Sequence, residues 1–248
     1  MIIRIAHLYY DLMNLYGENA NIRALQMFFE RQNVNVKIDY LTVGDEINFK
    51  KYDIFYMGMG SEKSQLIALN DLMKRKNEVK KAIEDNKYFF LTGNSYELLG
   101  KYIIDFDGNK IETLNIFNFY TKIITIKDMN NAATFRIVGE TSGNTKLIKE
   151  KVIGFQNKSG TIYNNDSPFL NITYGIGDRP NECNEGYIYN NLYATHLIGP
   201  LFIRNPYLTN YFVKKIIKEK DKNFKYKDIT NTIEFKAYKK YLENFPNI

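Results

Sequence analysis

The residue types best able to do chemistry gather at a glycine turn near the middle of the chain. Residues 88–92 form a short apolar run, rich in aromatic side chains, that predicts a buried strand. Gly93, Asn94 and Ser95 interrupt this run, and a helical pattern begins at Tyr96. Strand, sharp turn and helix make up a nucleophile elbow, in which a parallel sheet presents a reactive side chain at its upper edge. Ser95 is the residue of this turn that could serve as a nucleophile.

The composition predicts a folded protein without cysteine-based metal or disulfide chemistry. Of the 248 residues, 44% are hydrophobic and 15% aromatic, which is enough to fill a core. The single cysteine, Cys183, excludes a disulfide within the chain and a cysteine-based metal cluster. We expect no metal and no cofactor, and we interpret Cys183 as an incidental thiol.

The charge pattern argues against a nucleic-acid partner. The net charge is +6, but lysines alternate with acidic residues, as in residues 74–85, which is typical of a solvated face. No apolar run approaches the ~20 residues of a membrane-spanning helix, and no secretory signal precedes the first strand-like segment. We therefore expect a soluble, cytoplasmic protein with no transmembrane segment.

The order of elements predicts an α/β fold. Strand-like and helical patterns alternate before the elbow, with strands at 2–6, 36–40 and 53–57, a helix at 21–31 capped by Asn21, and a long amphipathic helix at 64–84. This rhythm predicts a mostly parallel central sheet flanked by helices, because parallel strands need crossover connections.

Beyond the elbow, the pattern changes to hairpins and then to two closing helices. Asp107 and Gly108 separate the strand-like runs 102–105 and 110–113, and further runs follow at 120–126 and 134–138. We expect these runs to form an antiparallel extension at one edge of the sheet. The helices begin at Pro206 and at 232. We expect residues 206–248 to pack on a single domain spanning residues 1–248.

The elbow resembles that of the class I glutamine amidotransferases, in particular their cobyric-acid-synthase-like group. The family run reads Cys-Gly-Gly-Tyr-Gln-Leu-Leu-Gly, and the matching residues are Tyr96, Leu98, Leu99 and Gly100. The family cysteine falls on Gly93, and the family glutamine falls on Glu97. The resemblance implies a flavodoxin-like sheet with the elbow at its carboxyl edge, but an elbow without its nucleophile.

Two earlier segments extend this resemblance. Residues 7–17 are similar to the opening of the glutaminase subunits of lipid II isoglutaminyl synthases, His-Leu-Tyr-Pro-Asp-Leu-Met-Asn-Leu-Tyr-Gly, and differ only at Tyr10. Residues 58–65 resemble the family's Gly-Gly-Gly-Gln-Asp-x-Glu-Gln, whose backbone amides help to hold an oxyanion. Gly58, Gly60 and Gln65 match this run, whereas Met59, Ser61, Glu62 and Ser64 depart from it. Gly58 and Gly60, with Asn94 and Glu97, are therefore the expected pocket residues.

Two later segments carry the residues that would handle substrate. Arg136 begins a run similar to the family's Arg-x-Ile-Gly, although a surface arginine on a strand is the alternative. Residues 154–160 resemble Gly-Phe-Glu-Asn-His-x-Gly; this segment keeps Asn157, with Gln156 and Lys158 in place of the glutamate and the histidine. By resemblance, Arg136 and Asn157 contact the substrate. A glycine-rich loop at 174–177 and the pair Glu185-Gly186 follow in the family's order.

The family's general base is also missing from its expected position. Residues 194–201 resemble Gly-Thr-Tyr-Leu-His-Gly-Pro-Leu, and the family histidine falls on Ile198. His196 lies two residues earlier, and a hydrogen-bonded structural histidine is the simpler interpretation of it. Gly93 cannot attack a carbonyl and Ile198 cannot transfer a proton. The loss of one member of such a unit typically costs about 10⁶ in turnover, and the loss of both costs little more.

Three hypotheses about function follow. The first is a degenerate, non-catalytic amidotransferase-like subunit that partners a Mur-ligase-type enzyme in the amidation of a cell-wall precursor; it predicts an exposed apolar patch. The second is an active glutaminase that supplies ammonia for lipid II amidation through relocated residues, Ser95 and His196. The third is an amino-acid-binding sensor, with Glu97 facing into a closed pocket and favouring a cationic ligand.

Overall fold

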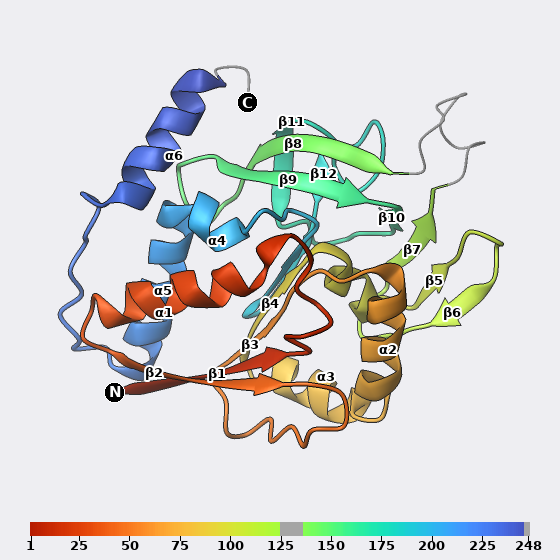
Figure 1. The fold of residues 1–248 in the computed structure, drawn as a ribbon, viewed down its shortest axis with the longest axis horizontal. Helices are drawn as coiled ribbons and strands as arrows, with labels where there is room; N and C mark the ends of the chain where they lie inside the picture. The colour runs from red at the N-terminus through yellow and green to blue at the C-terminus, as the bar shows by residue number, and fades with distance from the viewer. Residues whose placement is uncertain (125–135, 246–248) are drawn as a thin grey trace.

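A computed structural model, which describes residues 1–124 and 136–245, contains a central six-stranded sheet in the order β13-β14-β4-β3-β1-β2 (Figure 1). Its strands are β1 (Ile2–Leu8), β2 (Asn35–Leu41), β3 (Ile54–Met57), β4 (Tyr88–Thr92), β13 (Tyr187–Tyr189) and β14 (Leu192–Thr195). All neighbouring pairs are parallel except β13 with β14. The predicted α/β class with a mostly parallel sheet is confirmed.

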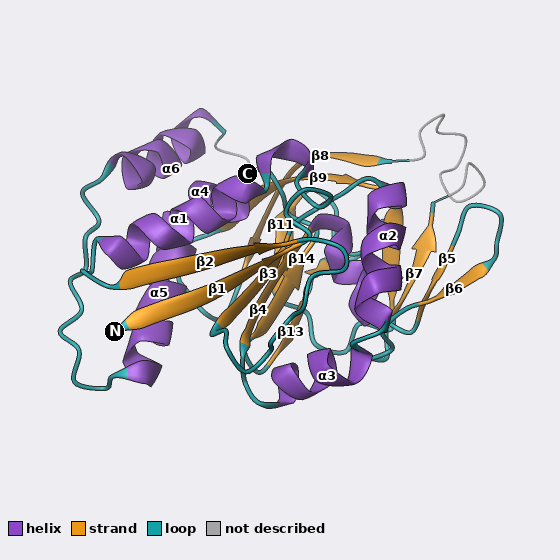
Figure 2. Ribbon diagram, turned by 60° about the horizontal axis from the view of Figure 1, so that its bottom comes forward, coloured by secondary structure: helices purple, strands orange, loops and turns teal. Residues whose placement is uncertain are grey.

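Helices cover both faces of this sheet (Figure 2). One face carries α1 (Asn19–Glu30), α4 (Leu201–Arg204) and α5 (Pro206–Lys220), and the other carries α2 (Glu62–Met73) and α3 (Lys76–Glu84). Strand β4 contributes side chains to the core on both faces of the sheet, because successive side chains of a strand point to opposite faces. Tyr88 and Phe90 pack with α1 and α5, whereas Phe89 and Leu91 pack with α2 and α3.

The antiparallel extension consists of two further sheets. One has the order β10-β7-β5-β6 and is built from β5 (Tyr102–Ile104), β6 (Lys110–Glu112), β7 (Tyr120–Ile123) and β10 (Gly160–Tyr163). The other has the order β12-β11-β8-β9 and is built from β8 (Ile137–Asn144), β9 (Val152–Lys158), β11 (Leu170–Tyr174) and β12 (Asn184–Glu185). The hairpin at Asp107-Gly108 joins β5 to β6 as predicted. However, β5 and β7 pair in parallel, so the first sheet is mixed.

Two local predictions were wrong. The helix expected at 64–84 is split into α2 and α3 at Lys74 and Arg75, whose side chains both bond to the buried carboxylate of Asp71. Asn21 does not cap α1, which begins two residues earlier. Its side chain instead donates to the Tyr56 hydroxyl at 2.7 Å and accepts from the backbone N–H of Phe202 at 2.7 Å. The predicted strand residues 125, 126, 134 and 135 lie outside the described residues.

The C-terminal helices contact the rest of the fold through aromatic side chains. Helix α5 begins at Pro206, as predicted, and α6 (Ile233–Asn244) follows. Phe235 of α6 is buried against Phe28 and Tyr207, and its neighbour Glu234 pairs with Arg31 at 2.7 Å. Within the described part of the chain, no helix has the length and apolar composition needed to cross a bilayer.

Candidate functional site

The carboxyl ends of four neighbouring parallel strands bring the predicted site residues together, as expected for a ligand site in an open α/β sheet. The glycine segment 58–60 follows β3, and the elbow follows β4. The segment with His196 and Ile198 follows β14, and residues 9–17 follow β1. Leu15 of this last segment donates its backbone N–H to the carbonyl of Met59 at 2.8 Å, so residues 9–17 lie against the glycine segment.

The elbow keeps the backbone geometry of a nucleophile turn. Gly93 has a φ of 64°, in the left-handed region that glycine adopts at low cost. A 3₁₀ helix, η2 (Gly93–Leu99), follows in place of the expected α-helical start. Asn94 ties the turn to the neighbouring segment, since its side-chain amide donates to the Gly60 carbonyl at 2.9 Å and accepts from the Gly60 N–H at 3.0 Å. The Gly60 amide, an expected oxyanion donor, is therefore already bonded.

Met59 occupies the space above Gly93. A Cβ atom added at Gly93 would lie 2.7 Å from Cγ and 2.9 Å from Sδ of Met59, and closer still to its Cβ. Real Cβ atoms essentially never make contacts this short, so any side chain at Gly93 requires Met59 to move. Gly58 is equally confined, because a Cβ there would lie 2.5 Å from the Met13 carbonyl oxygen and 2.7 Å from Cβ of Glu18.

The other family position, Ile198, is a packed structural residue. Its side chain is buried, and its backbone forms an antiparallel bridge with Phe155. The two backbone hydrogen bonds of this bridge have nitrogen-to-oxygen distances of 2.9 and 3.2 Å. The aliphatic side chain provides no atom that could take up or return a proton.

The structure does not bring Ser95 and His196 into a catalytic pair. The Ser95 hydroxyl is buried beside the carbonyl oxygens of Thr92 and Met57, at 2.8 and 3.0 Å. His196 Nε2 instead faces the Glu97 carboxylate, 3.3 Å from its Oε1. Among the hydrogen bonds of the described residues, none joins Ser95 to His196.

Glu97 is held inside the protein rather than left free in a pocket. Its Oε2 accepts a hydrogen bond at 3.0 Å from Nε2 of Gln65, which also donates to the Asn94 carbonyl at 2.7 Å. The cavity beside Glu97 has a volume of about 10 Å³. That volume is about the minimum for one water molecule.

A buried cluster of charged side chains lies next to Glu97, which contacts its histidine. The cluster consists of Lys158, Asp178, Glu185 and His196. Lys158 donates to the carbonyl oxygens of Gly177 at 2.6 Å and Asp178 at 3.3 Å. Burial lowers the pKa of Lys158, although the carboxylates around it oppose this effect. Burial, reinforced by the nearby Glu185 carboxylate, raises the pKa of Asp178 to about 7.

The carboxylates of Glu97 and Glu185 lie beside the two ring nitrogens of His196. Glu185 accepts hydrogen bonds at 2.6 Å from the Thr195 hydroxyl and at 2.6 Å from the backbone N–H of His196. Burial alone lowers the pKa of His196, but Glu185 and Glu97 outweigh burial and leave it raised.

Arg136 and Asn157, the residues expected to handle substrate, bond to each other at the rim of the site. Arg136 Nε donates to Asn157 Oδ1 at 2.6 Å, and its Nη1 pairs with Glu62 at 2.6 Å. Asn157 in turn donates to the Tyr16 hydroxyl at 2.6 Å. A chain of hydrogen bonds therefore links α2, β9 and the 9–17 segment across the top of the small cavity.

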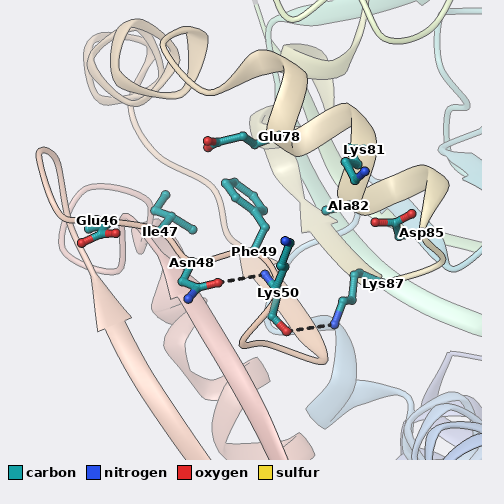
Figure 3. Close-up of a pocket in the computed structure, with 10 residues that line it drawn as sticks. All are labelled: Glu46, Ile47, Asn48, Phe49, Lys50, Glu78, Lys81, Ala82, Asp85 and Lys87. Carbon is teal, nitrogen blue, oxygen red and sulfur yellow. Dashed lines mark hydrogen bonds between the residues drawn. The ribbon is translucent and has the colours of Figure 1, made fainter.

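Larger cavities lie next to the small cavity and farther away from it. One of about 690 Å³ opens beside this rim and is lined partly by the apolar side chains of Leu66, Ile103, Ile111 and Ile123. Figure 3 shows a second, of about 410 Å³, between α3 and residues 46–50. Lys87, which directly precedes β4, lies in this second cavity. The second cavity is thus at the amino end of the strand, opposite the elbow, where open α/β sheets do not usually bind ligands.

The sequence and the fold of the chain identify its family. Residues 4–206 match the family model of the CobB/CobQ-like glutamine amidotransferase domain. The chain belongs to this amidotransferase family. It is 33% identical over 237 residues to the Staphylococcus aureus protein named lipid II isoglutaminyl synthase (glutamine-hydrolyzing) subunit GatD. The alignment covers 95% of this chain and 93% of that protein. The protein of the same name from Streptococcus pneumoniae is 30% identical over 220 residues, covering 88% and 82%.

Solved amidotransferase structures share the fold at low sequence identity. A glutamine amidotransferase from Thermotoga maritima aligns with a TM-score of 0.51 at 13% identity, over 98% of this chain and 85% of that one. A second glutamine amidotransferase aligns with a TM-score of 0.54 at 12% identity, over 86% and 98%. These likenesses support the amidotransferase fold alone.

Sequence reasoning located the amidotransferase elbow but missed how the site is filled. Met59 was noted only as a departure from the family run, and its contact with Gly93 depends on how two strand ends approach each other. The buried cluster was also missed, because Lys158, Asp178 and Glu185 are distant in sequence. The available signal was the replacement of uncharged or weakly basic family residues by Glu97 and Lys158, two charged residues in runs that resemble the family's site segments.

Proposed function

We propose that this chain is a non-hydrolysing, amidotransferase-like subunit, located in the cytoplasm, that partners a Mur-ligase-type enzyme in the amidation of a cell-wall precursor. The observation that carries the proposal is the packing of Met59 over Gly93, which leaves no room for a nucleophile at the elbow. Ile198 at the base position and the 10 Å³ cavity beside Glu97 support the same conclusion. A site that has lost both nucleophile and base retains little of the catalytic effect.

The names of the relatives support the proposal that this chain works with a partner protein. Both are called subunits of an enzyme that amidates lipid II. The alignments cover 95% and 88% of this chain, which supports a subunit of the same fold and similar length. The cavity of about 690 Å³ at the rim of the site is lined partly by the exposed Phe106, and it supports a binding role by offering a partner an apolar contact.

The two alternative functions find less support in the geometry. An active glutaminase with relocated residues needs Ser95 and His196 within hydrogen-bonding reach, and both are bonded to other groups. An amino-acid sensor needs a pocket large enough for its ligand around Glu97, whose carboxylate already binds Gln65 and His196.

The deciding experiment separates ammonia supply from ligase binding. The chain is co-purified with a Mur-ligase-type protein, and amidation of lipid II is measured with glutamine and, separately, with ammonium as the nitrogen source. We expect a stable complex that amidates with ammonium but not with glutamine. Amidation with glutamine that disappears in Ser95→Ala would establish the relocated active site. If the two proteins form no complex, the proposed partnership is wrong.

A further inference from the structure

Three donor atoms converge in the buried cluster below the elbow. The ligand atoms of Asp178, Glu185 and His196 all lie within 4.8 Å of one another, and all three side chains are buried. Nδ1 of His196 lies 3.7 Å from Oε1 of Glu185 and has no hydrogen-bond partner. A buried imidazole nitrogen that makes no hydrogen bond and only this long contact is costly unless a proton or a metal ion occupies the space between it and the carboxylate.

The surrounding hydrogen bonds leave lone pairs available for a cation. Each carboxylate oxygen can accept about two hydrogen bonds. The oxygens of Asp178 accept one each, from the Gly186 N–H at 3.1 Å and from the Asn165 amide at 2.5 Å. The oxygens of Glu185 also accept one each, from Thr195 and from the backbone of His196. Lys158, the nearby cation, donates to backbone carbonyl oxygens and leaves these lone pairs free.

Glu97 takes the place that an outer carboxylate occupies in many metal sites. Metal-binding histidines usually donate their other ring N–H to a carboxylate, which fixes the tautomer and makes the free nitrogen a better ligand. Glu97 Oε1 lies 3.3 Å from Nε2 of His196, on the opposite side of the ring from Nδ1. Gln65 holds the other oxygen of Glu97 in place at 3.0 Å.

We propose that Asp178, Glu185 and His196 hold a divalent transition-metal ion, with zinc as the best fit to their donors. One imidazole nitrogen with carboxylate oxygens suits zinc, whereas magnesium and calcium favour sites made of oxygen alone. Zinc bonds of about 2.0–2.2 Å place neighbouring donors about 3.4 Å apart. The 3.7 Å between His196 and Glu185 is close to this spacing. Two carboxylates also balance the charge of one divalent ion.

This site is separate from glutamine hydrolysis. It lies beneath Glu97 rather than at the elbow turn, and it requires neither a nucleophile nor a partner protein. Among the proposed ligands, His196 departs from the family runs, as do its neighbours Glu97 and Lys158. The cluster therefore distinguishes this chain from family members that keep those runs.

The test measures zinc directly on the full chain without an affinity tag. The protein is stripped with a chelator, dialysed against zinc and analysed for metal content, and binding is then titrated. All variants carry Cys183→Ser, which removes the exposed thiol as a competing ligand. We expect one zinc ion per chain. Glu185→Gln should weaken binding more than about a hundredfold, and Glu97→Gln, which removes only the outer partner, about 10–100-fold.

His7 provides the matched control, because it is the only other histidine in the chain. It is buried with both ring nitrogens unpartnered, but its ring neighbours are Tyr10, Tyr40 and Tyr56 rather than carboxylates. His7→Gln should therefore leave the zinc content at one per chain. A zinc content that is unchanged in Glu185→Gln, or lost in His7→Gln, would overturn the proposed ligands.

A measurement on the unaltered ligands covers the case in which Glu185→Gln does not fold. Two histidines give two sets of ring signals in nitrogen-15 NMR spectra. We expect zinc to shift Nδ1 of His196 into the range of a metal-bound nitrogen and to leave His7 unchanged. If His196 instead carries protons on both nitrogens with zinc present, it is an imidazolium clamped between Glu97 and Glu185, and the metal proposal is wrong.

Discussion

The side chain of Met59 lies in the space into which a side chain at Gly93 would project. The elbow keeps its left-handed turn at Gly93, but Met59, which follows the end of the neighbouring strand β3, packs against it. A side chain from another segment thus fills the position at which the family resemblance places the nucleophile. This packing can be tested by stability measurements that need no substrate.

Gly93→Ala should destabilise the protein more than Gly44→Ala. Both glycines have positive φ, 64° and 87°, so both substitutions carry the cost of a left-handed alanine, roughly 1–2 kcal/mol. A Cβ at Gly44 meets nothing within 4 Å, whereas one at Gly93 meets Met59. We expect an additional loss of about 1–3 kcal/mol at Gly93 from overpacking. Urea denaturation of both variants measures the difference.

Met59→Gly should recover this additional loss in the double variant. The Cβ of Met59 makes the closest contact, so alanine at 59 is not small enough. A double-mutant cycle over positions 59 and 93 isolates the pairwise term. A coupling free energy near zero would mean that Met59 moves aside freely and does not block the elbow.

Restoring the family residues at two positions should not restore hydrolysis. In a Cys183→Ser background, Gly93→Cys with Ile198→His should release no glutamate from glutamine, because Met59 still fills the space of the thiol. Adding Met59→Gly gives the smallest set of changes for which we expect glutamate release. Glutamate release by the variant that retains Met59 would contradict the steric argument.

Free glutamine should not bind the unaltered protein. The cavity at Glu97 has a volume of about 10 Å³, and Arg136 and Asn157 are bonded to each other above it. A ligand that binds only the folded state stabilises it by RT ln(1 + L/Kd), where L is the free ligand concentration, and so raises the melting temperature. We expect no shift with millimolar glutamine or arginine. A shift with arginine alone would favour the sensor hypothesis, in which Glu97 recognises a cation.

His7 and Glu18 should give the stability opposite dependences on pH. Burial lowers the pKa of His7 from 6.5 to about 4. Between pH 6.5 and about 4, His7 is therefore protonated in the unfolded chain but neutral in the folded chain. The contribution of His7 to the free energy of unfolding is fully present above pH 6.5 and is lost as the pH falls to about 4. The difference in pKa corresponds to about 3 kcal/mol. The groups that face the ring are the uncharged Tyr10, Tyr40 and Tyr56.

Glu18 should act in the reverse sense. Burial raises its pKa from 4.5 to about 7, despite hydrogen bonds from Thr92 and Tyr56 that favour the charged form. Its contribution is fully present below pH 4.5 and lost as the pH rises to about 7. In the unaltered protein, His7 makes the free energy of unfolding rise between pH 4 and 6.5, and this rise should be absent in His7→Phe. Glu18 makes the free energy of unfolding fall between pH 4.5 and 7, and this fall should be absent in Glu18→Gln. Parallel curves for all three proteins would refute both assignments.

The C-terminal helix should contribute to global stability through one face. Phe235 is buried against Phe28 and Tyr207, and we expect Phe235→Ala to cost about 3–5 kcal/mol. Ile233 begins the same helix but is 73% exposed, so Ile233→Ala should change the free energy of unfolding by less than about 0.5 kcal/mol. Equal effects of the two variants would mean that α6 is not part of the cooperative fold.

The sequence predicted what depends on local pattern. The βα order, the apolar alternation of residues 88–92 and the glycine at the turn were sufficient to place the elbow at the carboxyl edge of a parallel sheet. The break at Lys74 and Arg75 was missed because it depends on the buried carboxylate of Asp71, which looks like any helix-surface acid in the sequence.

Contacts between distant segments could not be predicted in this way. Asp178 and Glu185 meet His196 only because the second antiparallel sheet returns to the end of β14. Asn21 looked like a helix cap, but the tertiary fold gives its amide better partners in Tyr56 and Phe202. Local propensity is a weak guide where such long-range partners compete.

The contact between Met59 and Gly93 also implies an order of evolutionary events. The family runs place a cysteine at the position of Gly93 and a glycine at that of Met59, and under the proposed function an active ancestor would have carried both. A side chain at 93 requires methionine at 59 to move, so methionine would have been accepted more readily after the cysteine was lost. Once Met59 was in place, regaining the cysteine alone became destabilising. The loss of the nucleophile was therefore made difficult to reverse by a later substitution that had no chemical role of its own.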